Sequence, residues 1–330
     1  MLSHAPAIRG RFAPTPTGPM HLGNARTALL AWLDARSRGG AVVMRVEDLD
    51  GPRVRPGLEA RILEELRWLG LDWDEGPDRG GPHAPYRQSE RGGAYAEALE
   101  RLRAQGFVYP CFCSRAEIAQ ASQAPHASDE GPRYPGTCRD LSPAEREARR
   151  ARRPPAWRFR VPEGPVPFRD RIHGECSFDV AATVGDFVVA RADGVPAYQL
   201  AVVVDDAAME VTDVLRGDDL LPSTSRQLLL HRALGLREPA FAHVPLVVGP
   251  DGERLAKRHG AASVGELRDR GVAPETVTGC LAASAGLVPA GTRVMPAELV
   301  ASFRLDAVPR TPARLEAPLV AALPLLPRIQ

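Results

Sequence analysis

Short apolar segments alternate with amphipathic helical segments over residues 9–104, and this alternation constrains the fold more than any other feature of the chain. The spacing of apolar residues predicts, in order, strand 9–13, helix 25–36, strand 41–46, helix 58–69 and helix 94–104. Apolar residues recur at helical spacing in the fourth of these elements, at Ile62, Leu63, Leu66 and Leu69. Strands that alternate with helices in this way favour an α/β fold built around a parallel sheet.

The alternation stops near residue 109 and resumes near residue 186. Between these points Pro, Gly, Ser and Ala dominate as far as Thr137, and an Arg-rich run then leads to two prolines. We therefore expect an insertion between two halves of one α/β domain. The expected divisions are 1–108 (first half), 109–185 (insertion), 186–260 (second half) and 261–330 (a small helical C-terminal region). In the second half, the predicted elements are strands 187–191, 198–204 and 210–215 and helix 223–234.

Charge, hydropathy and cysteine content exclude several classes of protein. The 42 Lys and Arg residues nearly balance the 41 Asp and Glu residues, which excludes a globally basic nucleic-acid coat. No apolar run approaches the roughly 18 residues that cross a bilayer, and residues 1–11 lack the long apolar stretch of a secretory signal. We therefore expect a cytoplasmic protein with no membrane partner. Five cysteines are an odd number, which favours a metal site or free thiols over a disulfide framework.

Residues 11–24 run from a strand end through a Pro/Gly turn into a helix start. Such a helix start offers unpaired backbone N–H groups and partial positive charge to a phosphate. Gly18 and Gly23 let a ligand approach the backbone, and His21 and Asn24 add polar side chains. Neither a Walker phosphate loop nor a G-x-G-x-x-G turn is present, which disfavours ordinary NTPases and dehydrogenases. By itself the segment is equally compatible with a capped loop.

The chain contains a single lysine, Lys257, among its 42 basic residues. It follows a turn at 250–252 and is adjacent to Arg258. Arginine replaces lysine readily on a solvated surface, but not where a compact ammonium meets a phosphate. We therefore expect this segment to fold over a triphosphate and neutralise its charge. The alternative interpretation is a solvated basic hairpin.

Taken together, two segments resemble the signatures of class I aminoacyl-tRNA synthetases. His21-Leu22-Gly23-Asn24 is similar to the first signature, residues 254–258 are similar to the second, and residues 11–18 are typical of the glutamyl branch. The resemblance covers residues 8–260, after which no anticodon-binding domain is expected. This shorter arrangement is similar to the glutamyl-queuosine tRNA(Asp) synthetases. The resemblance implies a Rossmann-like class I synthetase fold whose insertion carries acceptor-binding elements.

The resemblance also implies roles for residues of both signatures. It assigns catalysis to His21 and Lys257, and ATP binding to His21, Gly23, Asn24, Lys257 and Arg258. Asn24 stands where the family has a histidine, and Arg254 and Ala256 stand where it has lysine and serine. These departures keep open a catalytically inactive paralogue that binds RNA or a nucleotide.

Selection of glutamate requires cations for two carboxylates and an acceptor for the ammonium group, because buried charges must be paired. Arg11, Glu47 and Arg216 are expected at or just after strand ends, where parallel sheets bind ligands. By resemblance, the glutamate-binding residues are Arg11, Phe12, Ala13, Pro14, Thr15, Glu47, Tyr198 and Arg216. The alternatives are a turn cap for Glu47 and a half-buried core aromatic for Tyr198.

Three cysteines fall in one irregular segment, at Cys111, Cys113 and Cys138. Such a segment buries little apolar surface, and a tetrahedral zinc ion would hold it together. The family resemblance implies that Tyr134 is the fourth ligand, with His126 as its competitor and three free thiols as the remaining alternative. The site is expected to be structural and to hold one zinc ion. Arg139 and the arginines of 146–153 form a basic stretch that suits either RNA phosphates or a solvated helix.

The resemblance therefore predicts a monomeric ligase that activates glutamate with ATP and Mg²⁺. The glutamyl group is then transferred to the queuosine base in the anticodon of tRNA(Asp). Two alternatives remain: a short glutamyl-tRNA synthetase that charges tRNA(Glu), and the inactive paralogue described above.

Overall fold

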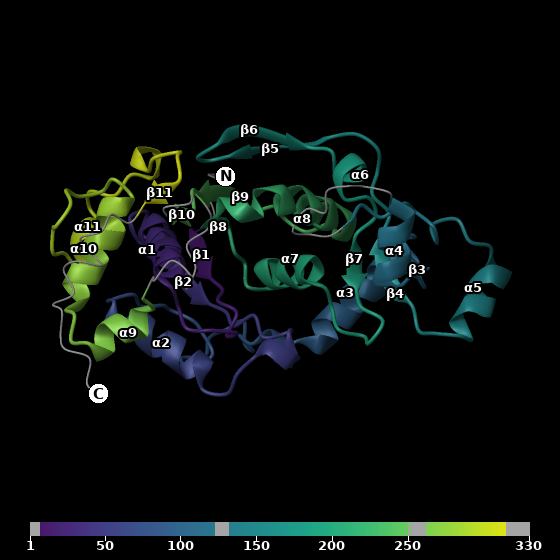
Figure 1. Ribbon diagram of the computed structural model, residues 1–330, viewed down its shortest axis with the longest axis horizontal. Coiled ribbons are helices and arrows are strands. Elements are labelled where there is room, and N and C mark those ends of the chain that lie inside the picture. Colours follow the sequence, from purple (N-terminus) through teal and green to yellow (C-terminus); the bar gives the residue numbers. More distant parts are fainter. Residues whose placement is uncertain (1–6, 123–131, 250–251, 253–261, 315–330) are drawn as a thin grey trace, which may run out of the picture.

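A computed structural model of the chain describes residues 7–122, 132–249, 252 and 262–314. The molecule is elongated, with the C-terminal helices at one end, the main sheet in the middle and a smaller sheet toward the other end (Figure 1). The helices are α1 (Leu22–Arg36), α2 (Leu58–Trp68), α3 (Gly92–Ala104), α4 (Arg115–Ser122), α5 (Pro143–Arg150), α6 (Val180–Thr183), α7 (Tyr198–Ala208), α8 (Leu221–Leu234), α9 (Val264–Asp269), α10 (Pro274–Ser284) and α11 (Pro296–Leu299). Short 3-10 helices are Gly51–Arg53, Gln88–Glu90, Asp218–Leu220 and Leu305–Ala307. No helix in the described ranges is long and apolar enough to cross a membrane.

The main sheet has six strands in the order β2-β1-β8-β9-β5-β6. Its strands are β1 (Arg9–Phe12), β2 (Ala41–Met44), β5 (Val166–Asp170), β6 (Gly174–Phe178), β8 (Asp213–Gly217) and β9 (Ala240–Val244). Every neighbouring pair is parallel except the β5-β6 hairpin at one edge. The carboxyl ends of β1, β2, β8 and β9 therefore meet at one edge of the sheet, as α/β sheets require for a ligand site.

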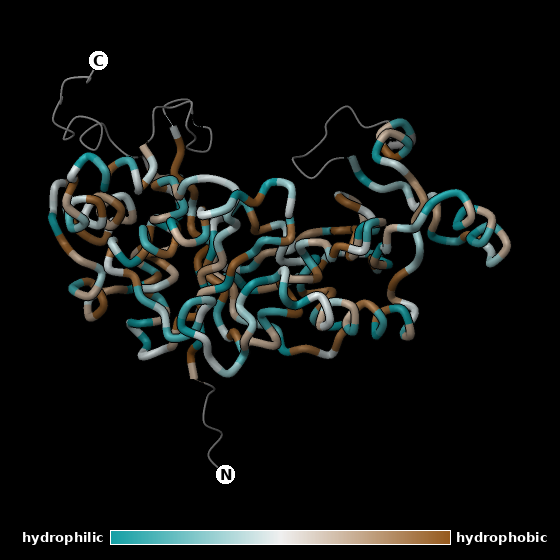
Figure 2. The backbone as a smooth tube through the Cα atoms, turned by 90° about the horizontal axis from the view of Figure 1, so that it is seen from below, coloured by the Kyte–Doolittle hydropathy of each residue, from teal (hydrophilic) through white to brown (hydrophobic). Residues whose placement is uncertain are grey.

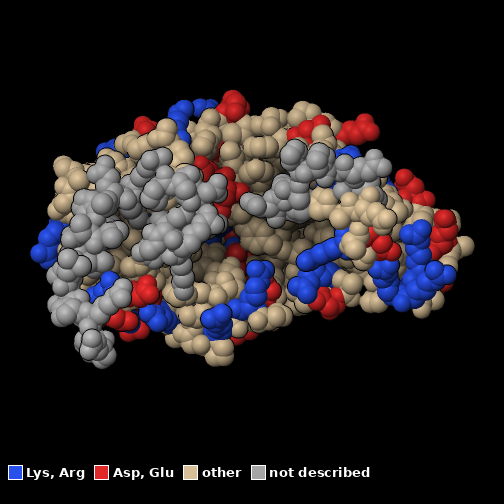
Figure 3. Space-filling model, viewed as in Figure 1, with Lys and Arg blue, Asp and Glu red and all other residues tan. Residues whose placement is uncertain are grey.

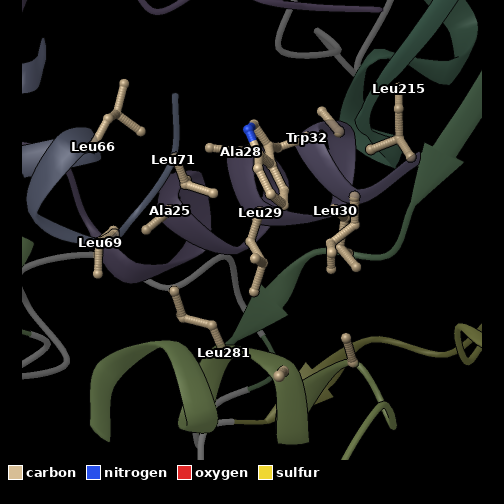
Figure 4. Packing of buried hydrophobic residues seen from close by; sticks show 14 of the residues in the cluster. Ala25, Ala28, Leu29, Leu30, Trp32, Leu66, Leu69, Leu71, Leu215 and Leu281 are labelled. Atoms are coloured by element: carbon tan, nitrogen blue, oxygen red, sulfur yellow. The ribbon is translucent and has the colours of Figure 1, made fainter. Parts of the chain in front are cut away.

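Helix α1 crosses over from β1 to β2 and is buried on nearly every face. It packs against β1, β8 and α10. Figure 4 shows Ala25, Leu29 and Trp32 of α1 beside Leu281 of α10 and the leucines that follow α2. A helix enclosed in this way keeps its amino end fixed relative to the sheet. Hydrophobic segments accordingly run through the interior of the molecule in Figure 2.

A second hydrophobic core joins the other face of the sheet to α3, α7 and α8. Here one sequence prediction is wrong, because 198–204, predicted as a strand, is the first part of α7. Its run of valines favours a strand locally. The helix prevails because residues 199–206 are all buried, between α3, α8 and β7 (Val188–Ala190).

A separate three-stranded sheet, in the order β3-β4-β7, extends from the second core. It is antiparallel and contains β3 (Val108–Cys111), β4 (Ala156–Phe159) and β7. The strand predicted at 187–191 thus lies in this sheet, whereas β5 and β6 of the 109–185 segment extend the main sheet. The domain boundaries proposed from the sequence remain a prediction. A third, two-stranded pairing joins β10 (Val247–Val248) to β11 (Ala313–Arg314).

Candidate active site

A cleft of about 620 Å³ opens between the carboxyl end of the main sheet and the amino end of α1. Its walls are formed by residues from five separate parts of the sequence: 11–27, 47, 198, 215–220 and 246–247. The described residues predicted to bind glutamate or ATP all line this cleft: Arg11, Phe12, Ala13, Pro14, Thr15, His21, Gly23, Asn24, Glu47, Tyr198 and Arg216. Lys257 and Arg258 lie outside the described residues, as do Arg254 and Ala256. The position of the second signature, residues 254–258, at this cleft therefore remains a prediction.

His21 caps the amino end of α1 at the floor of the cleft. Its backbone is extended, and its Nδ1 accepts a hydrogen bond from the backbone N–H of Asn24 at 3.3 Å. A ring nitrogen that accepts leaves the proton on the other nitrogen, Nε2. Gly23 permits this cap, because a Cβ there would lie 3.1 Å from the imidazole ring. The helix end thus combines backbone N–H groups and a histidine donor, a combination that suits a phosphate.

Two buried arginines, Arg11 of β1 and Arg216 of β8, provide positive charge to the cleft. The Nε of Arg11 lies 3.5 Å from Oδ1 of Asp206, and its Nη1 donates to the carbonyl of Leu215 at 3.5 Å. Arg216 lies within β8, whereas the sequence predicted it just after a strand. Its Nη1 is buried and has no hydrogen-bond partner in the part of the chain that the structure describes. A buried guanidinium nitrogen in a cleft wall is well placed to bind an anion.

Glu47 supplies buried negative charge to the cleft, whose lining also includes the exposed Asp219. It lies three residues beyond β2 and is 8% exposed, and its carboxylate accepts a hydrogen bond from Arg45 at 3.1 Å. Burial raises the pKa of Glu47, while the charges of Arg45 and Arg11 oppose this rise. The turn-cap alternative applies instead to its neighbour Asp48, which accepts hydrogen bonds from the backbone and hydroxyl of Ser89. Glu47 is therefore a buried acceptor beside two cations.

Arg45 is fully buried beneath Glu47 and has three carboxylates around it. Its Nη1 donates to Asp206 at 2.6 Å, and its Nε lies 3.8 Å from Asp205. These charges raise its pKa although burial opposes them. Because Asp206 contacts both Arg45 and Arg11, the network connects the acceptor and a donor of the cleft. Arg45, Asp205 and Asp206 were not predicted as site residues; their only signal in the sequence is an arginine and two aspartates within otherwise apolar segments.

Tyr198 is the first residue of α7 and faces the cleft with 37% of its surface exposed. It is therefore not a core aromatic. Together with Thr15, Thr17 and Glu47, it also lines a second cavity of about 740 Å³. This cavity extends toward the cysteines, and its other charged lining residues are Asp50, Arg53, Arg115, Arg158 and Arg191. The two cavities thus meet at Glu47 and Tyr198.

Cys111, Cys113 and Cys138 form a cluster that could hold a metal ion, with all three Sγ atoms within 4.8 Å of one another. The sulfurs of Cys113 and Cys138 are 3.6 Å apart. Thiolates bound to one tetrahedral zinc ion at 2.3 Å would lie about 3.8 Å apart, so the spacing fits. The hydroxyl of Tyr134 lies 3.4 Å from the sulfur of Cys111. His126 lies outside the described residues.

The basic stretch forms an exposed arm at the end of the molecule. Helix α5 has no buried residue, and arginine side chains gather over this end in Figure 3. Arg153 pairs with Glu117 at 3.0 Å, and Arg149 approaches the sulfur of Cys138 at 3.6 Å. Arg139 pairs with Asp186. Part of the stretch is therefore paired within the fold.

Comparison with known proteins identifies the family of the chain. Residues 7–304 match the family described as tRNA synthetases class I (E and Q), catalytic domain. The chain therefore belongs to this family of class I tRNA synthetases.

Relatives that match most of this chain indicate which members of the family it is similar to. The chain is 58% identical to the Glutamyl-Q tRNA(Asp) synthetase of Symbiobacterium thermophilum, over 95% of this chain and 98% of that protein. It is 50% identical to the protein of the same name from Nitratidesulfovibrio vulgaris, over 92% and 94%. Identity to Glutamate--tRNA ligase 2 of Syntrophus aciditrophicus is 46%, over 90% of this chain but 62% of that protein.

A solved structure agrees with these relatives. The glutamate tRNA ligase of Elizabethkingia meningosepticum, in complex with its amino acid, matches with a TM-score of 0.84 and 32% identity. The match covers 96% of this chain and 69% of that one. The predicted fold class, the enzyme class and the resemblance to the Glutamyl-Q tRNA(Asp) synthetases are confirmed.

Proposed function

We propose that the chain activates glutamate with ATP in the first cleft and transfers it to the queuosine base of tRNA(Asp). The observation that carries this proposal is the charge pattern of the cleft, with Arg11 and Arg216 on its walls beside the buried carboxylate of Glu47. The two arginines complement the two carboxylates of glutamate, and the carboxylate of Glu47 complements its ammonium group. Arginine suits a carboxylate because its planar donors match the two oxygens. Thr15 and Tyr198 complete the enclosure of the amino acid.

ATP binds in this proposal at the amino end of α1. The backbone N–H groups near Gly23 and the donor of His21 meet the phosphates, and Asn24 adds a polar side chain. The α-carboxylate of glutamate attacks the α-phosphorus, the bond to the β-phosphate breaks, and glutamyl-adenylate and pyrophosphate form. No general base is needed, because the nucleophile is already a carboxylate. Lys257 and Arg258 are proposed to neutralise the departing pyrophosphate, and Mg²⁺ bound by ATP supplies further charge neutralisation.

The second cavity is the proposed route of the RNA acceptor. A hydroxyl of the queuosine ring must reach the carbonyl carbon of the adenylate, and the cavity joins the first cleft at Glu47 and Tyr198. Attack by this hydroxyl forms the ester bond and releases AMP. Arg53, Arg115 and Arg191 on the cavity walls suit the phosphates of the approaching strand.

Zinc is the proposed metal of the cysteine cluster, held by Cys111, Cys113, Tyr134 and Cys138. Four protein ligands leave no open position, so the ion would fix the fold of the insertion rather than take part in the reaction. The adjoining small core, which includes Tyr109, Phe112 and Leu141, contains few apolar side chains. A metal would compensate for this small core.

Two experiments test the proposal. Pyrophosphate exchange into ATP should depend on glutamate and should be far slower with glutamine or aspartate. Incubation with radioactive glutamate should then label tRNA(Asp) that carries queuosine, and should leave tRNA(Asp) lacking queuosine unlabelled. Labelling of tRNA(Glu) alone would instead establish the short glutamyl-tRNA synthetase, an alternative supported by the 46% identity to a glutamate--tRNA ligase. No exchange with any amino acid would establish the inactive paralogue.

A further inference from the structure

A buried histidine separates Arg216 of the cleft from a buried carboxylate. His243 of β9 lies opposite Arg216 of β8 in the parallel register, and Asp170 ends β5 on the other side of β9. Asp170 is 1% exposed, His243 0% and Arg216 4%. Neither Asp170 nor His243 lines the cleft. Nothing in the glutamate site as described above requires a histidine at this position.

The hydrogen bonds of His243 fix its tautomer. The Nε of Arg216 lies 3.0 Å from Nε2 of His243, and a guanidinium N–H can only donate, so Nε2 accepts. The ring proton is therefore on Nδ1, which lies 2.7 Å from Oδ2 of Asp170. Asp170 is itself held by the backbone N–H groups of Ile172 and His173, which donate to its Oδ1 at 2.9 Å. The three side chains form one directed chain of donors that ends on a carboxylate.

This chain of side chains places no carboxylate in direct contact with Arg216. Burial lowers the pKa of Arg216, and the charges of Asp206 and Glu47 oppose this larger effect. Burial lowers the pKa of His243 to about 4, although Asp170 opposes this change, so the ring is neutral at pH 7. Arg216 makes no ion pair with any carboxylate of the described residues. Its Nη2 donates to the neutral hydroxyl of Thr224 at 2.9 Å, and its Nη1 is the buried nitrogen without a partner in those residues. A carboxylate in direct contact with Nε would have neutralised the cation.

We propose that His243 is a positioning residue for glutamate binding, a neutral spacer that fixes the guanidinium plane of Arg216 and preserves its charge for a substrate carboxylate. This inference rests on the proposed function, because it takes glutamate as the ligand of Arg216. The spacer acts on the amino acid and not on ATP, since Arg216 is on the sheet side of the cleft and the helix end is formed by other residues. Asp170 secures the spacer by holding the proton on Nδ1.

The test compares His243→Leu, which removes the acceptor, with His243→Gln, whose Oε1 takes the place of Nε2. In pyrophosphate exchange, we expect His243→Leu to raise the KM for glutamate about 10- to 100-fold, the loss of one hydrogen bond to a charged group. The KM for ATP should change less than about twofold, and His243→Gln should recover most of the glutamate affinity. Equal changes in both KM values, or equal behaviour of the two variants, would overturn the proposal.

A second measurement detects the tautomer of His243 directly in the wild-type protein, so it requires neither a folded His243→Leu variant nor the exchange reaction. In the full-length protein with ¹⁵N-labelled histidine, one buried ring should show a protonated Nδ1 and a bare Nε2 at pH 7, and His243→Gln should remove that signal. A protonated Nε2 would contradict the inference. Should His243→Leu not fold, Asp170→Asn replaces it, and is expected to raise the KM for glutamate and weaken the Nδ1 tautomer. If the wild-type protein shows no glutamate-dependent exchange, the proposed function is wrong. If the wild-type protein exchanges but the variants do not behave as expected, only the proposed role of His243 is wrong.

Discussion

The hydroxyl oxygen of Tyr134 lies 3.4 Å from the sulfur of Cys111 and 4.0 Å from the sulfur of Cys113. An oxygen and a sulfur bound to one tetrahedral zinc ion would lie about 3.5 Å apart, so the phenol occupies the place of a fourth ligand. The same hydroxyl oxygen accepts the backbone N–H of Cys138 at 2.9 Å. Arg158 lies over the ring of Tyr134, at 3.8 Å from its centre. Burial and the hydrogen bond with Cys111 raise the pKa of Tyr134, and the backbone N–H of Cys138 opposes this rise. A bound zinc ion would displace the phenolic proton, because a ligand binds metal in its deprotonated form.

Tyr134→Phe should therefore weaken zinc binding without removing it. We expect the affinity to fall about 10- to 100-fold, because three thiolates remain and water takes the fourth position. Competition with a chromophoric chelator measures the change. Tyr109→Phe is the matched control, since Tyr109 is buried in the same small core but donates to Asp186. If both variants release zinc equally, the phenol of Tyr134 is not a ligand.

Arg45→Met should destabilise the protein strongly. The substitution leaves Glu47, Asp205 and Asp206 without the cation that they share, and breaking a buried pair on one side costs about 3–5 kcal/mol. Urea unfolding at pH 7 measures the loss. Arg191→Met is the control, because Arg191 pairs with Asp193 at the surface, where such pairs contribute less than about 1 kcal/mol. A loss of similar size in both variants would show that the buried network is not what stabilises the fold.

Glu47→Gln should lower glutamate activation while it preserves the fold. The amide removes the negative charge that we propose for the substrate ammonium, and loss of one buried charge partner costs at least about 2 kcal/mol. We therefore expect kcat/KM for glutamate in pyrophosphate exchange to fall by about 30-fold or more. Asp48→Asn is the control, because this neighbour contacts Ser89 and does not line the cleft. Unchanged exchange in Glu47→Gln would remove Glu47 from the site.

The sequence was sufficient to predict the cleft because its residues follow local rules. The Pro/Gly turn before α1 and the strand ends of β1 and β2 are set by short-range patterns, and the edge of a parallel sheet brings them together. Cys111, Cys113 and Cys138 were predicted because an irregular segment requires an additional constraint, whereas Tyr134 was implied only by the family resemblance. Residues 198–204 were predicted wrongly because burial among α3, α8 and β7 outweighs the strand preference of their valines.

The residues behind the cleft were not predictable in the same way. His243 and Asp170 lie in separate strands, 73 positions apart, and meet only because β5 pairs with β9. Arg45 and Asp206 are likewise 161 positions apart. No spacing rule connects such pairs, because their contact depends on the order of the strands and on how α7 packs. Their sequence signal is a charged residue inside an apolar run, which also occurs at ordinary core positions.

Stability should fall as the pH is lowered from about 6.5 to about 4, partly because of His243. An unfolded histidine binds a proton below about pH 6.5. Burial holds the pKa of His243 at about 4 in the folded protein, with the charges of Arg216 and His173 acting in the same direction and Asp170 opposing them. The unfolded state therefore binds more protons in this interval, which favours unfolding by about 3 kcal/mol at its lower end. Burial also lowers the pKa of His231, which adds a change of the same sign.

Urea unfolding of the wild-type protein and of His243→Gln at pH 7, 6 and 5 isolates the contribution of His243, because glutamine does not titrate. The variant should be less stable at pH 7, where Asp170 loses the donor on Nδ1 of His243, but its stability should decline less steeply toward pH 5. The loss of stability that remains in the variant as the pH falls is caused by His231 and by carboxylates whose pKa values folding lowers, such as Asp206. Parallel curves for the two proteins would mean that His243 takes up protons equally in the folded and unfolded states over this range, so that burial does not lower its pKa. A decline that is shallower in the wild-type protein than in the variant would mean that folded His243 is protonated at pH 7, which would exclude the neutral spacer beside Arg216.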